Sequence, residues 1–426
     1  MGRRARRAAA TDAATPVLTT GLLSVLGLLM TVNPIASNIY LPGLGEMAAE
    51  LGTTIAGAQI ALTGFLLGVA AGQLLVGALA DSLGRRPVLL LGLSVLTGAS
   101  VLVAAAPTIE LLIAGRVMQG LGSSAAVVVA RAIVSDTARG RQAAASYSVL
   151  MGMLAVGPLV GPLLGSLLMQ AGGWRTTFVA LIVLSAAYLV MSVFAVPETL
   201  APDARTPVRL GRLLDNYRRL LRDPGYTGNA LAMAVAFAAL ATHVSASSFV
   251  AQDVLDTDEW GFSFLYMCYA LAVLVGSSLN APLSARFGAR RMLIVCQAVA
   301  IGSTAAMVWF ATAGPFTVAT FLATIVPACA AGSAILANAT TLTLARAAFA
   351  AGSGAALMGC TQFLVGSLVS PLGGLMGPHT AVPMAVVMLA CFTLSVIAGV
   401  VGRWGERRGV VVVASEVART HPEERG

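Results

Sequence analysis

About twelve apolar stretches of helix length follow one another along this chain, and they constrain its fold more than any other feature. A helix needs roughly 20 apolar residues to cross the hydrocarbon core of a bilayer. The stretches cover residues 17–40, 55–78, 87–105, 111–132, 147–169, 177–196, 228–250, 263–283, 292–311, 315–336, 354–375 and 380–401. The sequence therefore predicts an all-α membrane protein with about twelve transmembrane helices.

The balance of residue types excludes a soluble protein. Hydrophobic residues make up 58% of the 426 residues and charged residues only 10%, which leaves too little polar surface to coat a globule. The formal net charge of +8 reflects membrane topology and contact with anionic lipid, so the lipid bilayer is an expected partner and nucleic acid is not. Because the five cysteines show no metal or disulfide spacing, we expect neither a metal nor another cofactor.

Arginine positions predict how the chain is oriented. All 26 basic residues are arginine, and they gather in alternate connections between the apolar stretches, whereas acidic residues dominate the other connections. Basic flanks remain on the cytoplasmic side of a membrane. The arginine-bearing segments are 3–7, 85–86, 139–141, 205–222, 286–291 and 403–408. We therefore expect a multi-pass protein of the plasma membrane, the inner membrane of a bacterial cell, with both termini in the cytoplasm. The first apolar stretch is too long for a signal peptide and is interpreted as an uncleaved helix.

A polar segment divides the apolar stretches into two sets of six. A weak internal repeat supports this division, because the segment after the eighth stretch echoes the one after the second: Asn280, Arg286, Gly288, Arg290 and Arg291 against Asp81, Gly84, Arg85 and Arg86. Two similar halves that face one another across a central cavity are typical of membrane transporters. The predicted organisation is a cytoplasmic tail at 1–16, a six-helix half at 17–196, a cytoplasmic linker at 197–227, a six-helix half at 228–402 and a cytoplasmic tail at 403–426. Residues 210–221 of the linker are expected to form an amphipathic helix on the anionic leaflet.

The segment between the second and third stretches reads Gly-Ala-Leu-Ala-Asp-Ser-Leu-Gly-Arg-Arg. Gly84 permits a backbone conformation that a side chain would hinder, and Asp81 can accept hydrogen bonds or face a helix N-terminus. This segment resembles the loop between the second and third helices of the major facilitator superfamily. The resemblance implies a gate latch, in which Asp81, Arg85 and Asp136 form a charge cluster when the halves close on the cytoplasmic side. The alternative is that the arginines serve topology alone. The predicted gating motif comprises Gly77, Asp81, Gly84, Arg85, Arg86, Arg131 and Asp136.

The fourth stretch carries an unusual polar stripe. Arg116, Gln119 and Ser123 share one face at helical spacing. An arginine this deep in lipid would cost several kcal/mol, so it should face the cavity or pair internally. In the superfamily, an arginine at this place is associated with proton coupling and substrate binding. The alternative is a structural arginine neutralised by helix ends.

Small residues four positions apart mark the fifth stretch, at Gly157, Gly161 and Gly165, with Pro158 and Pro162 between them. Such a face allows close helix packing, and the prolines are expected to kink the axis. Similar glycine-proline motifs mark the antiporters of the superfamily, although the same face can be a packing surface only.

The segments 37–42 and 131–136, together with Gln362, make the chain resemble the branch of bicyclomycin and chloramphenicol exporters (Bcr/CflA-like), which are drug:proton antiporters with 12 helices. In that branch the position of Asn38 is typically Asp, a plausible proton site, and asparagine cannot titrate. His243 is the mid-helix group that titrates near neutral pH. It is interpreted either as the proton carrier or as a hydrogen-bonded packing histidine, and Glu46 and Asp136 near the helix ends are the other candidate carriers.

These features together predict a secondary transporter that exports small amphipathic or apolar compounds, with protons as the exchanged partner, and that works as a monomer. No nucleotide-binding loop or catalytic cluster occurs, so neither ATP drive nor an enzyme is expected. The alternatives are a transporter dedicated to one metabolite and a transport-inactive membrane sensor. The candidate cavity residues are Asn38, Tyr40, Arg116, Gln119, Ser123, His243, Tyr266, Tyr269, Asn338 and Gln362.

Overall fold

The computed structural model describes residues 18–202, 205, 210–375 and 379–420. Within these ranges, 12 helical segments are long and apolar enough to cross a membrane, which confirms the predicted fold class. The predicted tail at 1–16, positions 203–204 and 206–209 of the linker, and residues 421–426 lie outside the described residues.

Six spans form the N-terminal half. The first is built from α2 (Thr20–Asn38), a 3₁₀ turn (Leu41–Gly43) and α3 (Leu44–Glu50), and the others are α4 (Ile55–Leu83), α5 (Arg85–Ala104), α6 (Ile109–Thr137), α7 (Gly140–Gly172) and α8 (Trp174–Ala195). Within this half α4 packs on α6, α2 packs on α7, and α5 packs on both α6 and α8.

The C-terminal half repeats this arrangement. Its spans are α10 (Pro224–Phe249) with a π-helical turn (Val250–Val254), α11 (Glu259–Phe287), α12 (Ala289–Thr312), α13 (Val318–Arg346), α14 (Ala351–Val369) with a 3₁₀ turn (Ser370–Gly374), and α15 (Val382–Thr420). The equivalent pairs pack together, since α11 lies on α13, α10 on α14, and α12 on both α13 and α15. The structure therefore confirms two six-helix halves.

Polar residues at the membrane boundary start many of these helices. The side chain of Thr54 accepts a hydrogen bond from the Gly57 amide (3.0 Å), and the Asp258 carboxylate accepts one from the Gly261 amide (2.7 Å). Such N-caps satisfy amides that have no partner inside the helix.

The linker helix α9 (Leu210–Arg222) lies between the halves and agrees with the helix expected at 210–221.

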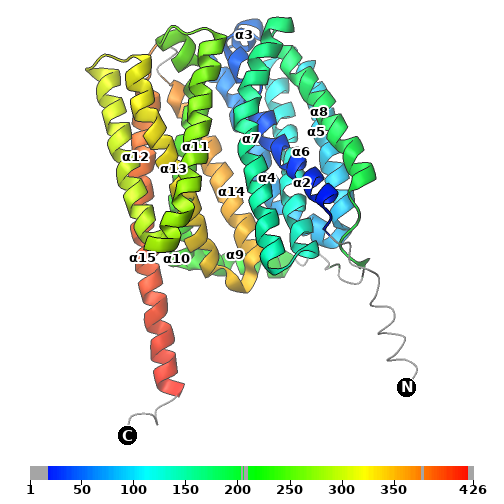
Figure 1. Ribbon diagram of the computed structural model, residues 1–426, viewed down its shortest axis with the longest axis vertical. Helices are drawn as coiled ribbons and strands as arrows, with labels where there is room; N and C mark the ends of the chain where they lie inside the picture. The colour runs from blue at the N-terminus through cyan, green and yellow to red at the C-terminus, as the bar shows by residue number, and fades with distance from the viewer. Residues whose placement is uncertain (1–17, 203–204, 206–209, 376–378, 421–426) are drawn as a thin grey trace.

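The two halves meet along two helix pairs. Helix α4 contacts α14, and α7 contacts α11, in the middle of the molecule (Figure 1). The start of α2, the end of α15 and the linker helix α9 all lie at the same end, at the bottom of Figure 1. For this reason the two ends of the molecule are called the α9 end and the far end below.

Several helices are longer than the apolar stretches that predicted them. Asp81 belongs to α4, so Gly84 alone connects α4 to α5. Arg131 and Asp136 were expected after the fourth helix, but they lie inside α6. The last helix continues to Thr420, beyond the expected end at residue 401. Hydropathy detects the lipid-embedded part of a helix, whereas the hydrogen-bonded backbone continues through polar residues at the surface.

Candidate substrate and coupling site

Arg116 of α6 is completely buried. Its Nη1 donates to the Ala36 carbonyl (2.8 Å) and to Oε1 of Gln119 (3.0 Å), and its Nε donates to the Ala61 carbonyl (3.3 Å). The guanidinium therefore links α6 to α2 and α4. Its Nη2 has no hydrogen-bond partner among the described residues.

Aromatic rings surround the same guanidinium. Its Cζ lies 4.5 Å from the ring centres of Tyr40 and Phe65, and 5.9 Å from that of Phe178. These are cation–π distances, and the rings replace part of the hydration that the cation has lost. Arg116 makes no ion pair within the described part of the chain. The charge is thus held by dipoles and rings, without a carboxylate.

The polar stripe predicted on the fourth span is buried and linked by hydrogen bonds to neighbouring helices. Nε2 of Gln119 donates to Ser100 of α5 (2.9 Å), and Ser123 accepts a hydrogen bond from Asn33 of α2 (3.1 Å). Arg116 and Gln119 contact one another directly, whereas Ser123 lies two turns further along α6. The stripe therefore ties α6 to α5 and α2, and its role in transport stays a prediction.

Asn38 joins the two halves. Its Oδ1 accepts a hydrogen bond from the Tyr266 hydroxyl of α11 (2.7 Å), while its Nδ2 donates to the Pro34 carbonyl (2.6 Å) and to Ser37 (3.1 Å). The amide is thus fully engaged, with its acceptor directed to the C-terminal half. An isolated sequence could not have shown this pairing, because it depends on how α2 meets α11.

His243 of α10 belongs to an aromatic row that continues from Tyr266. The ring centres of Tyr266 and Tyr269 are 5.1 Å apart, and those of Tyr269 and His243 are 4.8 Å apart. His243 is 2% exposed, yet neither Nδ1 nor Nε2 has a hydrogen-bond partner among the described residues. The expectation of a packing histidine that is hydrogen-bonded is therefore wrong on one point, because the described residues offer the ring no hydrogen bond. A buried imidazole without hydrogen-bond partners is costly, and a role of His243 in transport stays a prediction.

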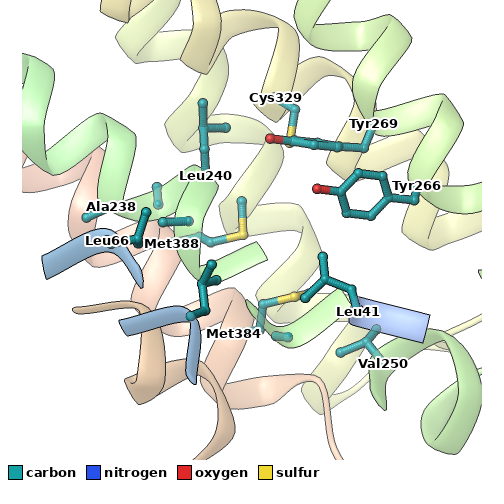
Figure 2. Packing of buried hydrophobic residues seen from close by; sticks show 14 of the residues in the cluster. Leu41, Leu66, Ala238, Leu240, Val250, Tyr266, Tyr269, Cys329, Met384 and Met388 are labelled. Carbon is teal, nitrogen blue, oxygen red and sulfur yellow. The ribbon is translucent and has the colours of Figure 1, made fainter. Parts of the chain in front are cut away.

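Apolar side chains line the surroundings of this row. Figure 2 shows the Tyr266 and Tyr269 rings side by side, with their hydroxyls directed toward the side of the cluster that holds Leu240 and Met388. The same hydrophobic cluster includes Tyr40 of the N-terminal half and therefore extends across both halves. Apolar walls with few polar anchors suit small organic ligands.

All hydrogen bonds between the halves in the described part of the chain lie toward the far end. Besides the Asn38–Tyr266 bond, they include Gln59 to the Ser245 carbonyl (2.9 Å) and Ser166 with Ser263 (2.6 Å). These residues stand near the ends of their helices that are opposite α9. The halves are thus joined next to the Arg116 and His243 clusters, because Arg116 contacts Ala36 and Tyr40 on either side of Asn38, and Ser245 lies two residues from His243.

The glycine face of α7 packs against α2. A Cβ at Gly157 would overlap Pro34, one at Gly161 would lie 3.2 Å from Asn38, and one at Gly165 would overlap the Ile39 carbonyl. Both Pro158 and Pro162 lie inside α7. The motif positions the helix that carries Asn38, which agrees with the packing interpretation, and an antiporter role stays a prediction.

The charge cluster expected at the gating motif is present. Arg85 contacts Asp81 (2.5 Å) and Asp136 (2.9 Å), and Gly84 has the positive φ of 110° that favours glycine. All three charged residues belong to the N-terminal half. The expectation that these contacts need closure between the halves is therefore wrong, because they form within one half.

Sequence reasoning missed Glu198 at the same turn. Its carboxylate accepts hydrogen bonds from the amides of Arg85 (3.0 Å) and Arg86 (3.3 Å) and thereby caps α5. The signal was an acid directly after the sixth apolar stretch. Two residues of the motif lie apart from the charge cluster: Gly77 faces open space, and Arg131 offers its carbonyl to Tyr147.

The remaining predicted cavity residues lie elsewhere in the C-terminal half. Asn338 of α13 donates to Asn280 of α11 (2.7 Å), and Gln362 is half-buried on α14. At the turn equivalent to Gly84, Gly288 has a φ of 86°, and Arg290 contacts Glu406 of α15. The repeat seen in the sequence thus retains its backbone turn, with different ionic partners.

Twelve spans in two similar halves, with a buried polar cluster where the halves meet, define a membrane transporter. The sequence model of the Major Facilitator Superfamily matches residues 26–374, and the chain belongs to this family. The family indicates a transporter rather than an enzyme.

Three relatives illustrate the similarity. The uncharacterized MFS-type transporter YdgK of Bacillus subtilis is 32% identical over 370 residues, which are 86% of this chain and 91% of that protein. The bicyclomycin resistance protein homolog of Haemophilus influenzae is 30% identical over 388 residues, or 90% and 94% of the two chains. Multidrug resistance protein D of Escherichia coli is 32% identical over 258 residues, or 60% and 64%. These names are consistent with the exporter branch predicted from the sequence.

Proposed function

We propose that this protein is a proton-coupled exporter that moves small apolar or amphipathic compounds out of the cytoplasm by alternating access. The observation that carries the proposal is a buried polar cluster at the meeting of the halves, with every described hydrogen bond between the halves beside this cluster or toward the far end. The relatives with names that refer to bicyclomycin and multidrug resistance support the choice of cargo.

The arginine-rich connections support the orientation. Arg85 and Arg290 lie in the first turns of α5 and α12, Arg139 directly precedes α7, and Arg403 lies in the part of α15 beyond its predicted apolar stretch, all on the side of α9. Since basic flanks stay in the cytoplasm, the α9 end is proposed to be cytoplasmic and the far end external. Substrate then enters between the halves from the α9 end.

Export requires the contacts at the far end to open. In the proposed cycle the halves rock about the buried site, the Asn38–Tyr266 hydrogen bond breaks, and the site opens outward. Because Asn38 cannot titrate, His243 is the proposed proton carrier, since its ring nitrogens are free of protein partners among the described residues.

The test is an accumulation assay in an efflux-deficient bacterium that expresses the protein. Cells are loaded with chloramphenicol, and the amount retained is compared with and without a protonophore. The proposal expects lower accumulation that the protonophore abolishes. Unchanged accumulation, with the protein verified in the membrane, would instead support a carrier for one metabolite or a sensor that does not transport.

A further inference from the structure

The buried charged side chains in the described part of this protein are all positively charged. The charged side chains that are buried are Arg85 and Arg116, and no Asp or Glu is among the buried residues there. Arg85 is neutralised by two carboxylates, whereas Arg116 makes no ion pair in the described ranges. Arg116 is therefore the uncompensated cation of the membrane interior that the structure describes.

The open hydrogen-bonding capacity at Arg116 favours acceptors. Its Nη2 is buried without a described hydrogen-bond partner by geometry, and an arginine nitrogen can only donate. The Tyr40 ring lies 4.5 Å from the guanidinium, so the two groups address one place. Across the interface, His243 adds a ring with two unpartnered nitrogens. A ligand that satisfies these groups must bring oxygen or nitrogen acceptors.

Among the described residues, no carboxylate pairs with Arg116 to offer a cation an opposite charge. The position that joins the halves next to this site, Asn38, carries a neutral amide, and Asn338 on α13 does so too. The described acids of the N-terminal half stand at the ends of its spans: Glu46, Glu50, Asp81, Glu110 and Asp136. In the low-dielectric interior, two like charges repel strongly over several ångströms.

We infer that this site selects uncharged, acceptor-bearing compounds and excludes permanently cationic ones. The inference rests on the proposed export function and names the substrate class of the same site. The described acids at the far end, such as Glu259 and Asp253, lie beyond the hydrogen bonds that close that end and cannot offset Arg116. A discrimination of about tenfold or more between neutral and cationic compounds is expected from repulsion of this kind.

The experiment compares export of neutral chloramphenicol with export of two permanent cations, ethidium and tetraphenylphosphonium, in efflux-deficient cells. Each is measured for the natural protein and for two variants that add the same carboxylate at different places. Asn38→Asp puts the charge at the Tyr266 hydroxyl, close to the Arg116 cluster, whereas Asn338→Asp puts it beside Asn280 as a matched control. Membrane levels of each variant are checked by immunoblot.

The expected result is export of chloramphenicol but not of the cations by the natural protein, with cation export gained in Asn38→Asp and absent in Asn338→Asp. Export of both cations by the natural protein overturns the charge selection while the export function stands. An Asn38→Asp protein that is present in the membrane but gains no cation export overturns the electrostatic cause. Export of none of the three compounds by the natural protein overturns the proposed function and the inference together.

Discussion

The two halves share helix order and packing, yet their buried polar groups differ in the hydrogen bonds that they make. In the N-terminal half, Arg116 donates to carbonyls of two neighbouring helices and to Gln119, so it holds those helices together. In the C-terminal half, His243 stacks near Tyr269 but makes no hydrogen bond among the described residues. One half thus uses its buried polar residue to join helices, whereas the other leaves a buried ring without a hydrogen-bond partner among the described residues.

The equivalent turns show the same divergence. Gly84 and Gly288 adopt similar positive φ values, 110° and 86°. Around the first, Arg85 pairs with acids of α4 and α6, and around the second, Arg290 pairs with Glu406 of α15. The positive-φ glycine turn is repeated in the two halves, whereas the ionic partners around it are not.

The largest effect is expected from Arg116→Met. The change removes the donors to the Ala36 and Ala61 carbonyls and leaves Gln119 without its buried partner. We expect a loss of about 3 kcal/mol in stability together with loss of export. Thermal unfolding and drug accumulation measure the two effects. Arg286→Met, on the exposed end of α11, is the control and should change neither.

The next effect concerns the packing that supports this cluster. A Cβ at Gly120 of α6 would overlap the Phe65 carbonyl of α4, so Gly120→Ala should cost about 2 kcal/mol. Gly98→Ala on α5 is the matched control, because no atom lies within 4 Å of the added carbon. The midpoints of thermal unfolding of the two variants are compared in the same detergent. Equal midpoints would contradict the close approach of α4 and α6.

A smaller effect is expected where the halves are joined. Tyr266→Phe removes the hydroxyl that donates to Asn38, and this change should destabilise the closed state of the far end by about 1 kcal/mol. Tyr269→Phe alters the neighbouring ring, whose hydroxyl makes no hydrogen bond in the described ranges. Opening of the far end is measured in a protein whose native cysteines are removed and whose Ser263 is replaced by cysteine. The measured quantity is the rate at which a reagent added outside alkylates this cysteine. An equal rate in both variants would show that the hydrogen bond does not hold the halves.

The smallest effect on stability, and the sharpest contrast with Arg116, is expected from His243→Phe. A phenylalanine retains contact with Tyr269 and Phe321 while it removes two unpartnered nitrogens. Stability should be unchanged or rise by up to about 1 kcal/mol, since burying an unsatisfied polar group is costly. Export should nevertheless be lost. A clear fall in the thermal midpoint would mean that the imidazole has a structural partner.

Much of the architecture could be predicted from the sequence, because lipid permits few solutions for long apolar stretches. The twelve spans and the buried Arg116 stripe followed from hydropathy and helical spacing alone. The Asn38–Tyr266 contact could not be predicted, since it joins residues far apart in the chain through the docking of two halves. Glu198 was missed because a lone acid at a helix end gives no pattern that distinguishes a cap from a solvated charge.

The most direct test of the central claim is equilibrium binding of radiolabelled chloramphenicol to purified His243→Phe in lipid nanodiscs. The claim is that Arg116 of one half and His243 of the other contact a single ligand between the halves. It predicts a protein at least as stable as the natural one that binds chloramphenicol about tenfold more weakly, because a lost polar contact of about 1.4 kcal/mol has that effect. Binding at the natural affinity by the folded variant would contradict the claim that His243 contacts the ligand.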